Sequence, residues 1–176
     1  CVKCFEALKD EDVHKTIISV NGQAPQEVEY GTTLDQIIPE AKAVRIGNRI
    51  WGAEVRTQRL DESFPIENGV IETYSDQECV VKKAEEFVGK LREKCCGKCV
   101  FCREGLAQIH EGLKDLTDGK AKLTDIDLMK ELAEIMKRQS NCSLGQTAPG
   151  MILGLQEYFA EDIKEHLAGR CHTLAC

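Results

Sequence analysis

Hydrophobic and polar residues alternate in short runs over the first half of the chain, which predicts a small sheet. The expected strands are 16–20, 26–30, 43–46, 49–52 and 69–74. Asn21-Gly22 lies between the first two strands, and this dipeptide favours a tight hairpin turn. A short helix is expected at 35–38, where Thr32 or Thr33 can act as its cap. This order of elements predicts an α+β unit of β-grasp type.

After Tyr74 the hydrophobic spacing changes to three and four residues, which is typical of helices. The spaced positions are Val80, Ala84, Phe87, Val88 and Leu91 in a first helix, Leu106, Ile109 and Leu113 in a second, and Leu128, Leu132 and Ile135 in a third. Asp76 is the expected cap of the first helix, and Thr124–Asp127 resembles a capping box for the third. A last helical stretch covers 150–159 and continues to about 167. The second half therefore predicts a four-helix-type bundle.

These patterns divide the chain into four parts. They are an N-terminal segment with a Cys-x-x-Cys pair (1–14), the β-grasp domain (15–75), the helical bundle (76–168) and a short Cys-x4-Cys tail (169–176). The chain has 176 residues, which suits two small domains of this kind.

The charge and the hydropathy of the chain argue against several classes of protein. The formal net charge is −7, and an acidic chain does not offer the basic surface that nucleic-acid binding needs. No apolar run approaches the length of a membrane span, and no secretory leader opens the sequence. We therefore expect a cytoplasmic protein with protein partners.

Ten cysteines are the unusual feature of the composition. A secreted disulfide scaffold would be shorter and would distribute its cysteines along the chain, whereas here they cluster beside Lys/Glu-rich helical sequence. Clustered thiols in such a chain are typical of metal binding.

The densest cluster is Cys96-x-x-Cys99-x-x-Cys102. Zinc sites usually use two separate Cys-x-x-Cys pairs, whereas three thiolates at this spacing plus one remote cysteine are typical of a [4Fe–4S] cluster. Cys142 is the candidate fourth ligand, because it lies between two expected helices with Gly145 close by. A zinc knot and a disulfide pair are the alternatives.

The stretches CGKCVFCREG (96–105) and NCSLGQTAP (141–149) resemble the NADH- and flavin-binding subunit of respiratory complex I and of NAD-linked and electron-bifurcating hydrogenases. The resemblance assigns Cys96, Cys99, Cys102 and Cys142 as ligands of a [4Fe–4S] cluster. The family has a serine where this chain has Cys95, and a proline where it has Phe101, so Cys95 is an additional thiol that is not expected to be a ligand.

Residues 19–38 are similar to the soluble-ligand-binding β-grasp (SLBB) insert of the same family. The resemblance thus covers about residues 15–176 and leaves out the flavin domain. It implies that this chain itself binds neither FMN nor NAD and is a non-catalytic subunit. It also implies that flavin- and NAD(P)-binding subunits, with other iron–sulfur subunits, are its partners.

A second group of possible ligands consists of Cys79, His166, Cys171 and Cys176. Three cysteines and a histidine suit a tetrahedral zinc ion, and hydrogenase-type relatives look similar at these positions. Two alternatives remain open: Cys171 and Cys176 could belong to a second iron–sulfur cluster, or His172 could replace His166. His166 by itself could also be a surface residue near a helix end.

We expect an electron-transfer module that relays electrons to or from a flavin on a partner subunit, within a multisubunit and electron-bifurcating NAD(P)H-linked oxidoreductase. The alternative is a structural or regulatory adaptor that metals brace and that docks through the β-grasp domain. Cys1 and Cys4 could contribute half of a metal site, form a redox pair, or have no role.

Overall fold

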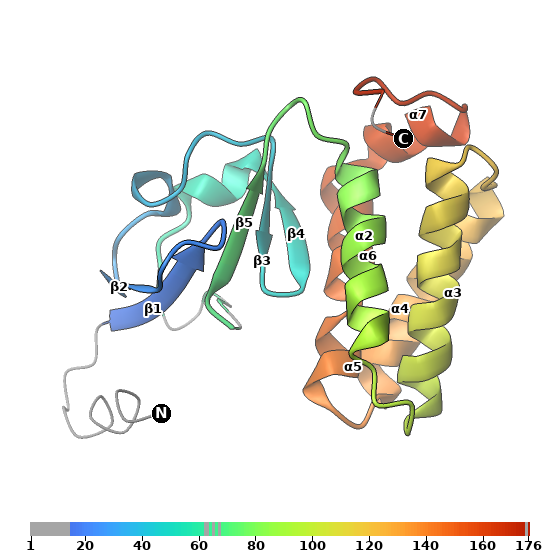
Figure 1. The fold of residues 1–176 in the computed structure, drawn as a ribbon, viewed down its shortest axis with the longest axis horizontal. Helices are drawn as coiled ribbons and strands as arrows, with labels where there is room; N and C mark the ends of the chain where they lie inside the picture. The colour runs from blue at the N-terminus through green and yellow to red at the C-terminus, as the bar shows by residue number, and fades with distance from the viewer. Residues whose placement is uncertain (1–14, 62–63, 65, 67, 175) are drawn as a thin grey trace.

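A computed structural model of the chain describes residues 15–61, 64, 66, 68–174 and 176. In it a five-stranded sheet comes first and a group of helices follows (Figure 1). The strands are β1 (Lys15–Val20), β2 (Gln26–Glu29), β3 (Ala43–Ile46), β4 (Arg49–Gly52) and β5 (Val70–Tyr74). The Cys1 and Cys4 pair lies outside the described residues.

The sheet has the strand order β2-β1-β5-β3-β4, with β1 and β5 parallel and the other neighbours antiparallel. Asn21 and Gly22 take φ values of 50° and 73°, which confirms the predicted hairpin turn. The short helix is a 3-10 turn, η1 (Leu34–Gln36), with Thr33 as its N-cap residue but without a side-chain capping bond. A second such turn, η2 (Ala53–Thr57), follows β4. The α+β prediction is confirmed.

The helices are α2 (Val80–Glu93), α3 (Val100–Thr117), α4 (Leu123–Gln139), α5 (Ser143–Thr147), α6 (Gly150–Tyr158) and α7 (Ala160–Leu167). Two predicted caps were wrong. Cys79, not Asp76, caps α2, because its Sγ accepts the backbone N–H of Lys82 at 3.4 Å. At α4 the carboxylate of Asp125 accepts the backbone N–H of Lys122 at 2.7 Å, so the helix begins before Thr124.

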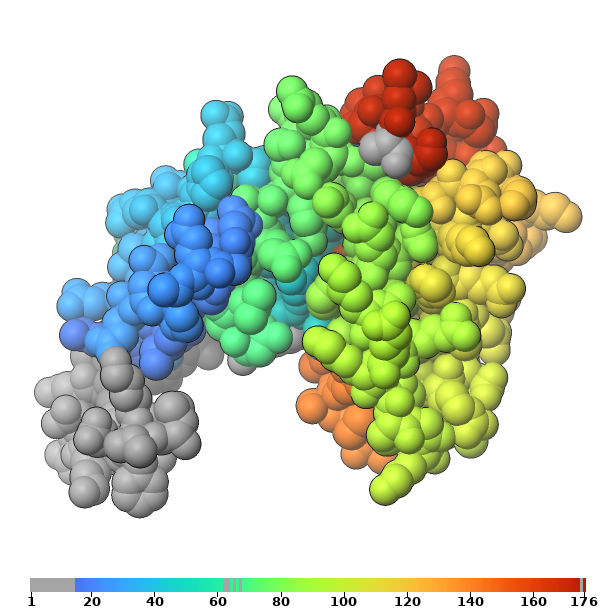
Figure 2. Space-filling view, viewed as in Figure 1, coloured from blue at the N-terminus to red at the C-terminus, as the bar shows by residue number. Residues whose placement is uncertain are grey.

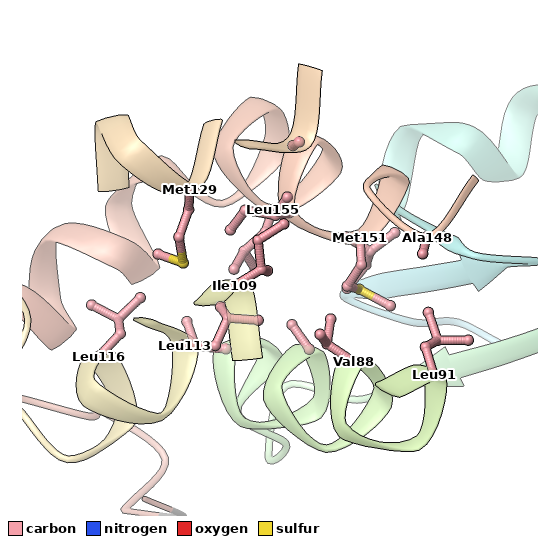
Figure 3. Packing of buried hydrophobic residues seen from close by; sticks show 14 of the residues in the cluster. Val88, Leu91, Ile109, Leu113, Leu116, Met129, Ala148, Met151 and Leu155 are labelled. Atoms are coloured by element: carbon pink, nitrogen blue, oxygen red, sulfur yellow. The ribbon is translucent and has the colours of Figure 1, made fainter. Parts of the chain in front are cut away.

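The core of the bundle lies between α2, α3, α4 and α6 (Figure 3). Val88 and Leu91 of α2 and Ile109 and Leu113 of α3 lie along one side of this core, and Met129, Leu155 and Met151 lie opposite them (Figure 3). These side chains are buried, and burial of apolar surface is the main force that holds the helices together.

The buried face of α4 differs from the prediction. Leu128 and Ile135 are exposed, while Ile126, Met129, Ala133 and Met136 are buried. The reason is the shape of α3: a Cβ at Gly105 or Gly112 would collide with the side chains of Met136 and Met129, respectively. The flexible methionines fill the space that the two glycines leave.

The sheet and the bundle meet along α6, and they form two adjacent lobes in the space-filling view (Figure 2). Gly154 lies directly against the backbone carbonyl of Ile50 in β4, so this part of α6 packs on the strand without an intervening side chain. Lys42 and Asp162 form a second link at 2.6 Å. None of the helices in the described part of the chain combines the length and the apolar character needed to cross a lipid bilayer.

Candidate metal centres

The first candidate site lies where α2 ends, α3 begins and α5 begins, at one end of the bundle (Figure 1). Cys99 is the N-cap residue of α3, and Cys102 lies in the first turn of the same helix. Gly97 has a φ of +74°, which lets the loop turn back before Cys99. Cys142 is the N-cap residue of α5, so it presents its thiol from a separate loop.

A glycine brings the two loops together. A Cβ at Gly145 of α5 would lie 3.0 Å from the Cβ of Cys102 and would collide with Ser140. The start of α5 therefore packs closely on the first turn of α3, which places the Cys142 loop beside Cys102. This agrees with the expectation that a remote cysteine joins the Cys-x-x-Cys-x-x-Cys loop.

The thiols of this region differ in exposure. Cys99 and Cys102 are buried, Cys95 is half-buried, and Cys96 and Cys142 are exposed. Burial is the largest factor that raises the pKa of Cys102 to about 12, and its sulfur neighbours Cys95, Cys142 and Cys99 raise it further. Without a cation Cys102 therefore stays a neutral thiol, and its thiolate form needs the positive charge that iron would supply in a cluster.

Hydrogen-bond donors surround Cys99. The backbone N–H groups of Cys102 and Asn141 hold the pKa of the Cys99 thiol below its usual range, with smaller contributions from Phe101 and the hydroxyl of Ser140. Ser140 is buried, and within the described residues its hydroxyl has no partner at normal hydrogen-bond geometry. The donors and the unused hydroxyl fit an anionic iron–sulfur cluster at this position.

Sequence reasoning did not single out Ser140. The available signal was a small polar residue two positions before Cys142, which is too common to identify a site. Arg103, which follows Cys102, pairs with Glu104 at 2.8 Å and donates to the carbonyl of Gly97 at 2.9 Å, so it holds the loop against α3.

The second candidate site lies at the opposite end of the bundle, where α2 begins and α7 ends (Figure 1). The ligand atoms of Cys79, His166, Cys171 and Cys176 all lie within 4.8 Å of one another. Nε2 of His166 is 3.3 Å from the Sγ of Cys79 and 3.3 Å from that of Cys176. The structure thus brings together the four residues that the sequence grouped.

His166 is oriented for metal binding. Its Nδ1 lies 2.6 Å from the carbonyl oxygen of Asp162, so Nδ1–H donates to that carbonyl and Nε2 faces the sulfurs. His166 is buried, which excludes the surface role considered for it. His172 is exposed and pairs with Glu165 at 3.2 Å, so it does not replace His166.

The pKa values of Cys79, His166 and Cys176 depend on one another. The hydrogen bond with Cys79 is the largest factor that raises the pKa of His166 to about 9. Burial opposes ionisation of Cys79, but hydrogen bonds from His166, from the backbone of Lys82 and from Cys176 still lower its pKa. Burial, followed by contact with Cys79, raises the pKa of Cys176. Three sulfurs and one imidazole nitrogen suit a tetrahedral metal ion.

Residues 82–166 match the family model described as the NADH-ubiquinone oxidoreductase-F iron-sulfur binding region. This segment is an iron–sulfur binding region of that family. The match runs from α2 to α7, and it includes the whole first site and His166 of the second.

Relatives from other organisms support this assignment. An NADH-quinone oxidoreductase subunit from Streptomyces coelicolor is 28% identical over 169 residues, which cover 86% of this chain and 38% of the relative. The NADP-reducing hydrogenase subunit HndC of Solidesulfovibrio fructosivorans is 31% identical over 171 residues, with 85% and 35% covered. The chain therefore spans about a third of the length of these relatives and corresponds to their C-terminal part.

The fold is also found in a solved structure. An NAD+-reducing [NiFe]-hydrogenase in its H2-reduced state contains a chain that superimposes with a TM-score of 0.80 at 21% identity. The superposition covers 87% of this chain and 29% of that chain. At this level of identity the likeness establishes the fold, and the iron–sulfur assignment depends on the family model.

Proposed function

We propose that this chain is an electron-transfer module that holds one [4Fe–4S] cluster through Cys96, Cys99, Cys102 and Cys142. The observation that carries the proposal is the convergence of Cys99, Cys102 and Cys142 at the N-termini of α3 and α5, within the matched iron–sulfur region. When bound, the cluster would supply one-electron chemistry. The chain contributes thiolate ligands and amide donors, and it keeps the buried side of the site dry.

The protein environment favours the reduced form of such a site. Helix N-termini present free N–H groups and a positive partial charge, and two of them meet here. Donors near sulfur stabilise extra negative charge and raise a cluster's reduction potential. Cys102 lies on the buried side, while Cys142 lies on the exposed side. The exposed side is where we expect a redox partner to approach.

The first experiment is metal analysis of protein purified without oxygen. The proposal expects about four irons and four sulfides per chain, together with a paramagnetic signal that appears when dithionite bleaches the brown colour. Cys142→Ala should lose the intact cluster, whereas the matched control Asn141→Ala retains its backbone N–H and should keep it. Zinc without iron or sulfide in the wild-type protein would contradict the proposal.

For the second site we propose a structural zinc ion held by Cys79, His166, Cys171 and Cys176. The support is the close approach of three sulfurs to Nε2 of a histidine whose other nitrogen is fixed by Asp162. A four-coordinate site with no open position is typical of zinc that stabilises a fold. About one zinc per chain, retained after the iron is removed, is the expected result.

The relatives are named as subunits of a quinone oxidoreductase and of a hydrogenase. By analogy we propose that this chain works inside a multisubunit NAD(P)H-linked oxidoreductase and exchanges electrons with a flavin on another polypeptide. Electron bifurcation in that assembly is the finer proposal, and reduction of two acceptors from one donor by the purified complex tests it. We place the complex in the cytoplasm, because free thiolates are maintained in a reducing compartment.

One observation favours the alternative role as an adaptor. A hollow of about 340 Å³ lies beside η2 and the segment that follows it, next to the end of α6, and its walls include Trp51, Phe64 and Tyr158. Aromatic side chains in such hollows often contact partners or ligands. A colourless protein that still enters its complex would support the adaptor and exclude the electron relay.

A further inference from the structure

Cys95 is the one thiol of the loop between α2 and α3 that the proposed cluster leaves unused. Its backbone N–H donates to the carbonyl of Arg92 at 3.1 Å, so the end of α2 fixes its position. Its side chain is half-buried and packs against the core of the bundle. The helix end and the core therefore hold Cys95 in one place.

The thiol of Cys95 faces the cluster site. Its Sγ lies 3.6 Å from the Sγ of Cys102, which is buried in the first turn of α3. Cys95, Cys142 and Cys99 are the thiols whose charges act on Cys102. With Cys102 itself, four sulfurs thus gather at this position, and Cys95 is one of them.

Cys96 lies differently in the loop. It is exposed, whereas its neighbour Cys95 is half-buried. Gly97 follows with a φ of +74°, and its carbonyl oxygen accepts a hydrogen bond from Arg103 at 2.9 Å. The loop therefore turns directly after the cysteine pair, and the two adjacent residues present one half-buried and one exposed thiol beside the buried sulfurs.

We propose that this site offers five thiols for four ligand positions, and that Cys95 can bind the iron that Cys96 would otherwise hold. The inference rests on the proposed cluster. The exchange changes no oxidation state: the bond between iron and the sulfur of Cys96 breaks, a bond to the sulfur of Cys95 forms, and the proton lost by Cys95 is taken up by Cys96. Both ligands are thiolates on adjacent residues.

The test compares single and double replacements in the full chain, each purified without oxygen and reconstituted with ferrous iron and sulfide. Cys96→Ala and Cys95→Ala should each keep about four irons per chain and the paramagnetic signal of a reduced cubane. Cys95→Ala/Cys96→Ala should fall to about three irons or fewer, with a three-iron signal in the oxidised protein. Cys99→Ala is the control that should lose the fourth iron alone, without a second replacement.

Two results would overturn the inference. One is a three-iron cluster in Cys96→Ala that matches Cys99→Ala, and the other is a complete cluster in the double variant. Because Cys96 is exposed, its replacement should not disturb packing, and Cys96→Val must give the same result as Cys96→Ala. Absence of iron and sulfide from the wild-type chain would instead contradict the proposed function, so the two failures are distinguishable.

Discussion

The guanidinium carbon of Arg45 lies 4.1 Å from the centre of the Phe87 ring, and this contact joins β3 to α2. Arg45 is buried, pairs with Glu72 at 2.7 Å and donates to the carbonyl of Gly47. The sheet thus satisfies the charge of Arg45, while the planar face of its guanidinium group packs on the bundle. A stacked arginine of this kind combines ion-pair and cation–π contacts.

Replacement of Arg45 should weaken the junction between the sheet and the bundle. Arg45→Met keeps most of the side-chain volume but removes the ion pair and the stacking on Phe87. We expect a loss of about 2 kcal/mol in the free energy of unfolding, measured with urea. The loss is not larger because Glu72 is partly exposed, so that solvent screens the ion pair. Arg138→Met is the control, since Arg138 is exposed and its pair with Glu134 spans 3.5 Å. An equal loss in both variants would contradict the importance of this contact.

The Arg45–Glu72 pair also predicts a pH dependence. Burial opposes ionisation of Glu72, but Arg45 and the hydroxyl of Tyr74 outweigh it and lower its pKa below the ordinary value of 4.5. A lowered folded-state pKa adds stability above pH 4.5, and this stability is lost as the pH falls through the folded-state pKa. Glu72→Gln should therefore be less stable than wild type at neutral pH, and the difference should shrink in acid. A difference that stays constant in urea unfolding across this range would exclude the mechanism.

Gly154 should not tolerate a side chain. A methyl group there would collide with the backbone carbonyl of Ile50, which cannot move without shifting β4. We expect Gly154→Ala to cost about 1–3 kcal/mol, although alanine is the better helix former. Gly89→Ala on α2 is the matched control, because its methyl group would meet only the side chain of His110. Thermal unfolding of both variants tests the difference.

The hydroxyl of Ser140 should tune the cluster. If it donates to Cys99 or to a cluster sulfide, Ser140→Ala removes one donor and makes reduction less favourable. A hydrogen bond of about 1 kcal/mol corresponds to a potential roughly 40 mV lower for one electron. Redox titration followed by paramagnetic resonance measures this shift. Ser143→Ala, at an exposed position of α5, should leave the potential unchanged.

The two sites should load independently. His166→Ala removes the nitrogen ligand of the Cys79 site and should release zinc, while iron and sulfide stay at wild-type amounts. His172→Ala is the control, because His172 is exposed and pairs with Glu165. Elemental analysis of both variants is sufficient. Loss of iron together with zinc in His166→Ala would mean that the sites depend on each other.

The sequence predicted the secondary-structure elements, and the grouping of Cys79, His166, Cys171 and Cys176, better than the packing between the elements. Asn21-Gly22 and the spacing of Leu106, Ile109 and Leu113 act locally, so a turn and a helix face could be identified without tertiary information. Likewise, the spacing of Cys96, Cys99 and Cys102 indicated a cluster loop, since the three lie on one short segment.

What the sequence did not predict depends on contacts between distant segments. The buried face of α4 could not be chosen correctly, because it follows the space left by Gly105 and Gly112 on another helix. The burial of the Ser140 hydroxyl beside Cys99 and the contact of Cys95 with Cys102 also arise from packing between loops. The sequence could not show these relationships, because no local pattern records them.

The positions of the second site along the chain have a consequence for the unfolded protein. Cys79 is the N-cap residue of α2, His166 lies in the last turn of α7 and Cys176 follows that helix, and Cys79 is separated from the other two by 87 and 97 residues. A metal ion bound to all of them closes a loop that contains α2–α7. In the chain-entropy model a covalent cross-link of about 100 residues removes roughly 4.7 kcal/mol of unfolded-state freedom at 25 °C. A bound ion would act as a cross-link of this kind. Removal of the ion by a chelator would therefore increase the conformational entropy of the unfolded chain over α2–α7, and so lower the stability of the whole bundle and not only of its C-terminal tail.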